Sequence, residues 1–509
     1  INQLTTPYGT TTFEWGELPG INSEPGRYIE STDPYGDKER VEANDLAFGS
    51  SLDSYQYIDT YELRGPESVT VAGQNVSFLP KNDNLHYRNS YYWDKQQMKY
   101  HAGDHTKATI YNWLAVSNEI TGVLGSIKFP EEARIWYNYP GQTSSHAPGT
   151  LKSPSKTVKA VEDENGEPSW SMIQNEYEPN YGKVSKTIDP LGREILYEYN
   201  PNGIVPGSIT GIDLTALKVK SGAGYETIVS YSNFVNSLPQ TVTEASGTVT
   251  SHQYNSKGQI TQTTVSKGGD SETTRFIYDL DLDGTPDAHG YLVEVQHTDP
   301  MNPAGFVTLM AYTYDNTGRI HEETDTEGYT RIFDYDNFDR ITLITHPDST
   351  TEQFVYSNLD LEAQKDRNGN WTRFRYDAYR RPVIRQDANG DLIQFEWCRC
   401  GDIRKIIDAN FNVTHWVRDA QGRVTEKEFP DGTKNSYTYQ PYSGLLDTVT
   451  YANDQLSGQP TMRHRYFIDG SIQNVDYTDV NTPDVSYQYN DPLARLTAYT
   501  DQLGTTDYS

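Results

Sequence analysis

The feature that most limits how this chain can fold is a phrase that returns every 20 or 21 residues. Between residues 314 and 340 the sequence reads YDNTGRIHEETDTEGYTRIFDYDNFDR, so an aromatic residue, an acid, two variable residues, a small or polar residue and arginine occur twice. A fixed period of this length is typical of repeat architectures, in which each unit contacts only its neighbours. The spacing is regular from residue 314 to residue 439 and looser on either side. The principal aromatic anchors of the repeat are Tyr199, Tyr254, Tyr278, Tyr314, Tyr335, Tyr356, Tyr376, Trp397, Tyr439 and Tyr489.

Each repeat predicts a β-hairpin. A second aromatic often stands two residues before the anchor, as Phe333 does before Tyr335, and side chains two residues apart lie on the same face of a strand. Asp, Asn and Gly follow the anchor, and these residues tolerate tight turns. An arginine then opens the next strand, and we expect it to pair with acids or to stack on rings of the neighbouring unit. These arginines include Arg319, Arg340, Arg381 and Arg423.

The number of hairpins decides the architecture. Residues 169–509 would hold on the order of 30 strands, which at ~4.8 Å each make a ribbon roughly 140 Å wide. A twisted sheet rarely stays open beyond ~10 strands, so it must curl. A turn that used most of these strands would be too wide to be filled by its own side chains. The sequence therefore predicts an all-β array of antiparallel hairpins that curls into a spiral, hollow shell.

Four segments follow the repeat to different degrees. We expect divergent N-terminal repeats in residues 1–44, an irregular insertion in residues 45–135, a return to the array in residues 136–168, and the main array in residues 169–509. Because the chain stops in the middle of a repeat, we expect the array to be truncated at its C-terminal end.

The insertion is the part of the chain for which helices are expected. Ile110, Trp113 and Leu114 stand at helical spacing. We therefore expect residues 45–135 to place one or two short helices against the wall of the shell.

Composition narrows the classes of partner. The chain has a formal charge of -29, and its 71 acids are scattered along the sequence, so we expect an acidic folded surface that neither nucleic acid nor an anionic membrane would bind. The 39 Tyr, 15 Phe and 8 Trp supply the apolar area that a disordered chain lacks. No apolar run approaches the ~20 residues that span a bilayer, and the N-terminal residues do not resemble a signal peptide. We expect any export signal to have been removed or to lie outside this sequence.

One acidic turn has the spacing of a cation site. Asp279, Asp281 and Asp283 alternate before a glycine, and Asp287 follows. Alternate acids allow several oxygens to converge on calcium, as in the first half of an EF-hand loop. However, Gly290 stands where the bidentate glutamate of such a loop would be, and Asp279 is also the turn acid of its own repeat. Calcium, the one cofactor that the sequence suggests, and a simply enlarged acidic turn are therefore both open interpretations.

The two cysteines interrupt one anchor. Cys398 and Cys400 lie on either side of Arg399, directly after Trp397. A disulfide between residues i and i+2 requires the backbone to bend. We expect either a local disulfide or two small apolar side chains packed in the turn.

The repeated phrase resembles the YD-repeat or Rhs family. It stands as Ile188-Asp189-Pro190-Leu191-Gly192-Arg193 with Tyr197-Glu198-Tyr199-Asn200, and again from Tyr312 to Arg319. This family includes bacterial Rhs toxins, the C component of insecticidal toxin complexes and the teneurin ectodomains. The resemblance implies a spiral β-sheet shell, which encloses a C-terminal effector in the toxins and scaffolds adhesion in the teneurins. The self-cleaving segment of the toxin members has no equivalent that we can assign, so no protease residues are carried over.

Two functions follow as hypotheses. The first is a non-catalytic shell segment of a large secreted or cell-surface bacterial protein, with the rest of its own polypeptide, an effector or further repeats, as its partner. The second is an extracellular adhesion or carbohydrate-binding scaffold, with glycans or cell-surface proteins as partners and with rings outside the ladder, such as Trp93, as the contact. No residue pattern of a nucleophile elbow, a zinc protease or a phosphate loop is present.

Overall fold

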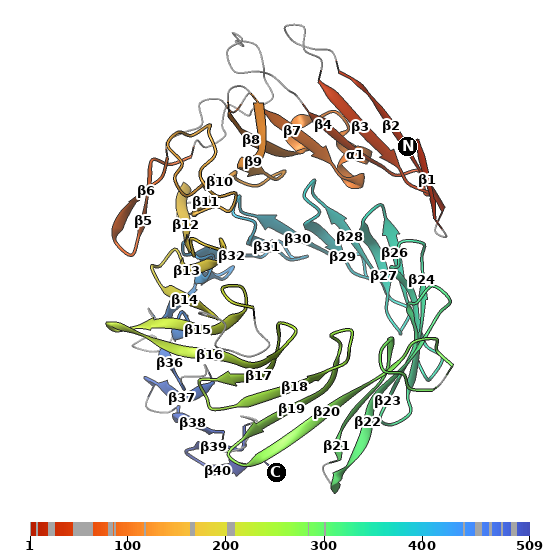
Figure 1. The fold of residues 1–509 in the computed structure, drawn as a ribbon, viewed down its shortest axis with the longest axis vertical. Helices are drawn as coiled ribbons and strands as arrows, with labels where there is room; N and C mark the ends of the chain where they lie inside the picture. Colours follow the sequence, from red (N-terminus) through yellow and green to blue (C-terminus); the bar gives the residue numbers. More distant parts are fainter. Residues whose placement is uncertain are drawn as a thin grey trace. The chain divides into compact units, whose positions relative to one another are not determined.

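The computed structural model of the chain is built almost entirely from β-strands (Figure 1). Within the described residues, 38 strands join one hydrogen-bonded sheet, and a further pair forms a separate hairpin. The prediction of an all-β array of antiparallel hairpins is therefore confirmed. No helix in this part of the chain is long and apolar enough to cross a membrane. The structure describes residues 2–6, 9–18, 26–43, 65–79, 85, 88–116, 119–162, 168–200, 209–283, 285–299, 302–440, 443–452, 461–467, 471–479, 482–489 and 496–508.

The chain divides into two compact units, each made from segments that are far apart in the sequence. Unit 1 consists of Ile1–Tyr177, Thr187–Gly192 and Phe354–Gly432. Unit 2 consists of Glu178–Lys186, Arg193–Gln353 and Thr433–Ser509. The strands β13 (Val184–Ile188) and β26 (Thr351–Ser357) contain boundaries between the units.

Unit 2 is an array of antiparallel hairpins. In the regular part, β23 pairs with β24 in the register Glu322↔Ile332, and β24 pairs with β25 in the register Asp334↔Leu343. The strands are β14 (Glu194–Tyr199), β15 (Leu214–Ser221), β16 (Gly224–Val235), β17 (Leu238–Glu244), β18 (Val249–Tyr254), β19 (Ile260–Lys267), β20 (Asp270–Asp279), β21 (Tyr291–Asp299), β22 (Asn302–Tyr314), β23 (Ile320–Asp325), β24 (Thr330–Tyr335), β25 (Ile341–Thr345), β34 (Lys434–Tyr439), β35 (Leu446–Thr450), β36 (Thr461–Tyr466), β37 (Ile472–Tyr477), β38 (Val485–Gln488), β39 (Ala498–Asp501) and β40 (Gly504–Asp507).

Unit 1 combines the same kind of hairpin with a more elaborate N-terminal part. Its repeat strands are β27 (Asp360–Lys365), β28 (Trp371–Tyr376), β29 (Pro382–Gln386), β30 (Leu392–Trp397), β31 (Ile403–Ile407), β32 (Val413–Arg418) and β33 (Val424–Glu428). Its N-terminal elements are β1 (Gln3–Thr6), β2 (Gly9–Glu17), β3 (Arg27–Thr32), β4 (Lys38–Ala43), the separate hairpin β5 (Ser68–Val71) and β6 (Gln74–Ser77), β7 (Asn89–Trp93), α1 (Lys95–His101), a 3-10 turn (His105–Lys107), β8 (Thr109–Val116), β9 (Glu119–Lys128), β10 (Ile135–Asn138), β11 (Lys156–Glu162) and β12 (Pro168–Tyr177).

The helix predicted around Ile110, Trp113 and Leu114 is wrong, because these residues lie in strand β8. This strand pairs with β7 on one side and with β9 on the other, and most of its residues are buried. Register shifts at Trp113 break the alternation of a regular strand. A strand that is buried on both faces and bulged produces an apolar spacing that resembles a helical one.

The expected insertion does contain helical structure, at a different position. Helix α1 begins after Asp94, whose side chain accepts a hydrogen bond from the Gln97 backbone N–H, and the Gln97 side chain accepts one from the Asp94 backbone N–H. This reciprocal capping box explains why the helix starts there. The segment boundaries at residues 44, 135 and 168 stay predictions.

The fully buried core is concentrated in the N-terminal part of unit 1. One cluster joins the β5–β6 hairpin to the sheet through Val69, Val71, Phe78, Leu85, Trp136, Val158 and Met172. Most side chains of the regular repeat strands, in contrast, are half-buried, as in β25 and β31. The repeats therefore depend less on a deep core than the N-terminal part does.

The repeat turns share one backbone geometry. In the turn that starts at Asp387, the Asp387 N–H donates to the Asp391 carbonyl and the Gly390 N–H donates to the Asp387 carbonyl. Gly390 has a φ of 92°, in the left-handed region that glycine adopts without a steric penalty. Phe411 occupies the same position of the turn at Asp408, with a φ of 63°, and its side chain is 80% exposed.

Replacing Phe411 with glycine is expected to stabilise its hairpin. An L-residue pays about 1–2 kcal/mol in the left-handed region, and the greater freedom of glycine in the unfolded chain offsets part of the gain. We expect Phe411→Gly to raise local stability by about 0.5–1 kcal/mol, measured by hydrogen exchange of the β31 and β32 amides. Gly390→Ala is the matched control and should lower stability in β29 and β30; a destabilising Phe411→Gly would contradict the strain at this turn.

Candidate functional site: the repeat turns and a cavity beside helix α1

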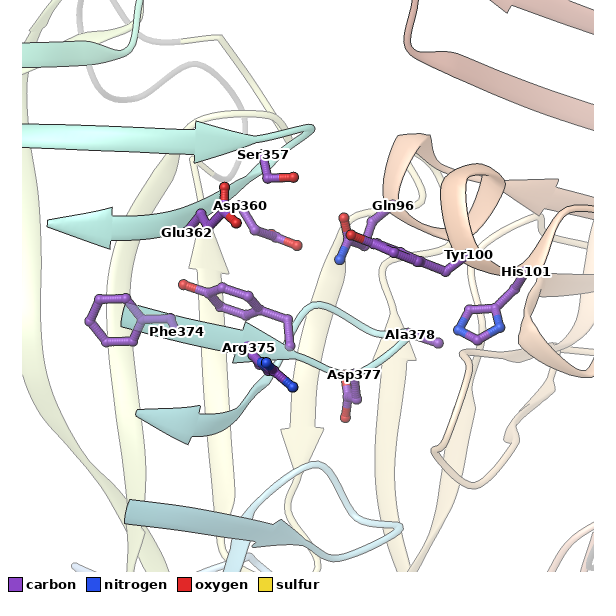
Figure 2. A pocket seen from close by; sticks show the side chains of 11 residues that line it. Gln96, Tyr100, His101, Ser357, Asp360, Glu362, Phe374, Arg375, Asp377 and Ala378 are labelled. Atoms are coloured by element: carbon purple, nitrogen blue, oxygen red, sulfur yellow. The ribbon is translucent and has the colours of Figure 1, made fainter. Parts of the chain in front are cut away.

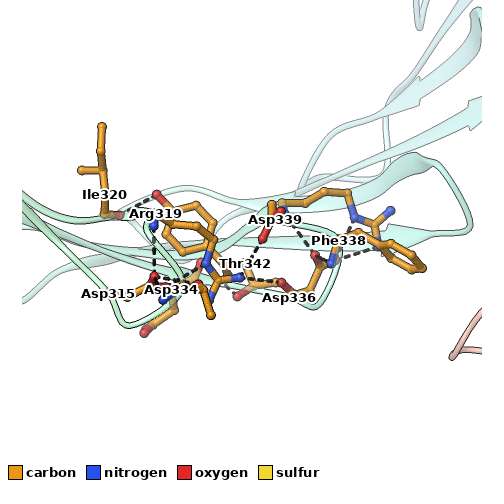
Figure 3. Close-up of polar contacts among 11 residues, drawn as sticks. Asp315, Arg319, Ile320, Asp334, Asp336, Phe338, Asp339 and Thr342 are labelled. Atoms are coloured by element: carbon orange, nitrogen blue, oxygen red, sulfur yellow. Dashed lines mark hydrogen bonds and ion pairs between the residues drawn. The ribbon is translucent and has the colours of Figure 1, made fainter. Parts of the chain in front are cut away.

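In the regular repeats, a turn aspartate organises the turn around its carboxylate (Figure 3). Asp315 Oδ1 accepts hydrogen bonds from the backbone N–H groups of Thr317, at 2.8 Å, and Arg319, at 3.0 Å. Its other oxygen, Oδ2, accepts one from Arg319 Nε at 2.7 Å. The side chain therefore satisfies two backbone donors of the turn and fixes the arginine that opens the next strand.

The same pair of backbone hydrogen bonds, from the second and fourth residues after the turn aspartate or asparagine, recurs in both units. It is found at Asp33, Asn255, Asp315, Asp325, Asp336, Asp366, Asp377, Asp387, Asp408 and Asp419.

Two kinds of turn differ in what the second carboxylate oxygen binds. After the anchors, an arginine Nε donates to it, as Arg340 does to Asp336 and Arg423 does to Asp419, both at 2.8 Å. At other turns an asparagine amide takes this place, as Asn370 does at Asp366. The sequence motif marks the first kind of turn more strongly because its arginine recurs.

The anchor aromatics brace the preceding strand through their polar atoms. The Tyr335 hydroxyl donates to the Ile320 carbonyl at 2.6 Å, and the Trp397 indole N–H donates to the Pro382 carbonyl at 2.8 Å; each acceptor lies 15 residues earlier. Equivalent hydroxyl-to-carbonyl bonds are made by Tyr199, Tyr254, Tyr278, Tyr314, Tyr376 and Tyr466. A register shift occurs at each of these anchors, so the ring leaves the regular alternation of its strand at that point.

The arginines also connect successive repeats. Arg319 Nη1 donates to the Asp336 carbonyl at 3.0 Å and to Asp339 Oδ1 at 3.1 Å, and the guanidinium lies 4.7 Å from the centre of the Tyr335 ring. Arg381 similarly lies 5.4 Å from the centre of the Trp397 ring. The structure thus gives these arginines both kinds of contact expected of them, to acids and to rings.

Removing the Tyr335 hydroxyl should loosen the strand that it braces. Tyr335→Phe leaves the Ile320 carbonyl without this donor, and we expect a loss of about 1 kcal/mol in local stability. Hydrogen exchange of the β23 and β24 amides measures the effect. Tyr329→Phe is the matched control, because the Tyr329 side chain is among the most exposed rings, 60% exposed. Equal protection in the two variants would show that the hydroxyl contributes nothing.

The turn carboxylates carry a pH dependence. Burial opposes ionisation of Asp315, but the Thr317 hydroxyl and the Arg319 N–H groups donate to the carboxylate and lower its pKa. The pKa of Asp336 is lowered in the same way, with burial opposed by hydrogen bonds from Arg340 and Phe338. A lowered pKa contributes stability that is present above the unfolded-state value of about 3.9 and is lost as the pH falls through the folded-state value.

Asp315→Asn should therefore remove part of the acid sensitivity of its hairpin. At pH 7 we expect the variant to be less stable by about 1 kcal/mol, because Arg319 loses its charged partner. Below pH 4 the difference from the native protein should shrink. Hydrogen exchange of β22 and β23 across this range tests the expectation, with Asp334→Asn, an exposed acid on β24, as control. A difference that persists unchanged at low pH would contradict it.

The acidic turn after Tyr278 brings together three of the four predicted ligands. One carboxylate oxygen each of Asp279, Asp281 and Asp283 lies within 4.8 Å of the others. Asp287 is used differently, because its Oδ2 accepts the Leu280 N–H at 2.9 Å and helps to close the turn. Asp279 Oδ1 likewise accepts the Leu282 N–H. Calcium binding by this turn stays a prediction.

The cysteine turn follows the geometry of the aspartate turns. Cys398 stands at the position of the acid, and its Sγ accepts the backbone N–H groups of Cys400, at 3.1 Å, and Asp402, at 3.4 Å. The structure bonds the Cys398 and Cys400 sulfurs to each other, and both residues are 6% exposed and pack against Val161. The turn also meets the N-terminal part of unit 1, where the Ala133 N–H donates to the Arg399 carbonyl. The chemical state of this pair stays a prediction.

A cavity of about 520 Å³ lies within unit 1 between helix α1 and the hairpins of β26 to β28 (Figure 2). The helix presents Gln96, Tyr100 and His101, and β27 presents Asp360 and Glu362. Hydrogen bonds that join the walls run from Gln97 Nε2 to the Ala378 carbonyl at 3.0 Å, from Lys99 Nζ to Ser357 Oγ at 2.8 Å and from Asn358 Nδ2 to the Lys95 carbonyl at 3.3 Å. Burial raises the pKa of Asp360, and the hydrogen bond from Arg380 opposes this shift.

The sequence motif did not identify this cavity. Its residues belong to the repeat around Tyr376 and to helix α1, whereas the sequence pattern predicts a helix around Ile110. A signal does exist in the turn after Tyr356, which reads Ser357-Asn358-Leu359-Asp360 and lacks the acid and glycine of the regular phrase.

Hairpins that are closed by a turn aspartate and braced by an aromatic of the next strand, repeated along one antiparallel sheet, define a β-hairpin repeat protein. A family model described as RHS Repeat matches residues 314–351. This match confirms that the chain carries Rhs repeats, as its resemblance to the YD-repeat or Rhs family predicted.

Solved structures similar to this chain include a Tc holotoxin pore and complexes of TcdB2 with TccC3. The chain is 10% identical to a Photorhabdus luminescens Tc holotoxin pore with a TccC3 mutation, with a TM-score of 0.47, and the match covers 97% of this chain and 30% of that one. For a TcdB2-TccC3-TEV crystal structure the identity is 12%, the TM-score 0.45 and the coverage 97% and 31%. The chain therefore spans about a third of the length of these structures. No curated protein matches it.

Proposed function

We propose that this chain is a non-catalytic wall segment of an Rhs-repeat shell. The observation that carries the proposal is the single antiparallel sheet of 38 strands in the described residues, built on repeats of which residues 314–351 match the Rhs model. A twisted sheet of this size does not stay open and flat, so curvature into a container is the expected outcome.

The proposed partner of the wall is the rest of its own polypeptide. The matched Tc toxin structures are about three times longer than this chain, which supports a role as one part of a larger protein. We propose that the complete protein is secreted or displayed on a bacterial surface and that its shell encloses a C-terminal effector. The charge of -29 disfavours nucleic acid as a partner.

Electron microscopy of the protein that carries this chain tests the proposal. We expect a reconstruction with a wall one sheet thick around an interior that is not filled by the side chains of the wall. A filled barrel, two sheets packed face to face, or a flat ribbon would each overturn the container.

An adhesion or carbohydrate-binding scaffold is the second candidate function. One observation counts against Trp93 as its sugar contact. Trp93, the ring expected to contact sugars, is 0% exposed and donates its indole N–H to the Asp104 carbonyl, so that expectation is wrong. The candidate now depends on exposed rings such as Trp15 and Tyr329. Specific retention of the protein on a glycan array would favour it, and a blank array would count against it.

A further inference from the structure

Two buried oxygen atoms at the cavity beside α1 have no hydrogen-bond donor among the described residues. They are Asp360 Oδ2 and Gln96 Oε1, and they come from opposite walls, β27 and α1. Asp360 is only 6% exposed, and an ion pair joins its Oδ1 to Arg380 Nε at 2.7 Å. A buried acceptor without a donor is costly, and a buried carboxylate oxygen is especially so. Such an atom beside a cavity indicates a donor that the described residues do not supply.

The missing partner is a donor of hydrogen bonds, because both of these atoms are acceptors. Glu362, on the same strand as Asp360, adds a third acceptor group and a second negative charge. Figure 2 shows Asp360 and Glu362 on one side of the cavity and Gln96 with Tyr100 on the other. An ammonium group has three N–H donors that point in different directions, so it can serve acceptors from separate walls.

The remaining walls suit an aliphatic chain. Tyr100, Phe374 and Tyr376 line the cavity with aromatic rings, which contact alkyl carbons and attract a cation over their faces. The cavity volume of about 520 Å³ falls in the range of small-molecule sites. We propose that this cavity binds a primary ammonium group carried on a short aliphatic chain, such as a lysine side chain or a free alkylamine, with Asp360 as its buried counter-ion.

Other occupants fit less well. A hard metal ion needs several oxygens that converge within bonding distance, and the groups of acidic or cysteine side chains that converge in this way among the described residues lie elsewhere, at Asp279 and at Cys398. A neutral sugar offers donors but adds no positive charge beside Asp360 and Glu362, of which Asp360 already pairs with Arg380. Arg375, an exposed residue of β28, also lines the cavity. Amine binding at this cavity does not require the chain to be part of a shell, so either proposal can fail without the other.

Calorimetric titration of the whole chain with pentylammonium tests the site, and 1-pentanol is the neutral control. We expect binding of the amine at millimolar concentration and at least about tenfold weaker binding of the alcohol. Asp360→Asn and Glu362→Gln should each weaken amine binding by about tenfold or more, whereas Glu396→Gln, an exposed acid on β30 outside the cavity, should not.

Folding is controlled separately, because Asp360 also holds Arg380. Circular dichroism melting identifies a variant that is destabilised. If Asp360→Asn is destabilised, Glu362→Gln still tests the site, because Glu362 is exposed. No heat with the amine, equal binding of amine and alcohol, or native affinity in Glu362→Gln and in a folded Asp360→Asn would overturn the proposal. Stronger binding of calcium or of methyl glucoside than of the amine would also overturn it.

Discussion

The regular part of this structure depends on one interaction, the carboxylate of a turn aspartate that accepts two backbone N–H groups of its own turn. At Asp315 one oxygen binds the N–H groups of Thr317 and Arg319, and the other binds the arginine side chain. This arrangement fixes the length of the turn. Because a slip of one residue would turn every side chain to the opposite face, a fixed turn also fixes the register of the two strands.

A ribbon made of half-buried strands needs such local determinants. The deep core lies in the N-terminal part of unit 1, around residues such as Val158 and Met172, and the regular repeats have few fully buried side chains. Their stability must therefore come from contacts within a hairpin and between neighbours. The tyrosine hydroxyl, which donates to a carbonyl of the preceding strand, and the arginine, which reaches the following turn, supply contacts in both directions along the sheet. This is the energetic pattern of a repeat protein, in which each unit is stabilised by those beside it.

The sequence predicts the structural features that recur in every regular repeat and misses those that occur at a single position. Hairpins, turns and arginine contacts follow from a phrase that recurs along the sequence. The hydrogen bond from the anchor ring to the preceding strand also has a regular spacing, because Tyr335 and Trp397 each bind a carbonyl 15 residues earlier. In strand β8, burial on both faces and a bulge hide the two-residue alternation of a strand, so the apolar spacing wrongly predicts a helix. Trp93 was assigned to the surface although the three-dimensional packing buries it completely. No local pattern records that packing.

Departures from the repeat are where special chemistry is concentrated. At Cys398 a sulfur replaces the turn carboxylate but keeps both of its backbone hydrogen bonds, which shows that the geometry tolerates another acceptor. At the turn after Tyr356 the acid and the glycine are both missing, Asn358 adopts a φ of 54° and reaches α1 through the Lys95 carbonyl. This turn is shorter than the turn after Tyr335, and Asp360 stands directly before Leu361, where a regular repeat carries its arginine, as Arg340 stands before Ile341. One oxygen of the Asp360 carboxylate lies at the cavity without a donor among the described residues. Local rules are expected to fail at functional positions, and here the failure of the motif and the unpartnered oxygen coincide.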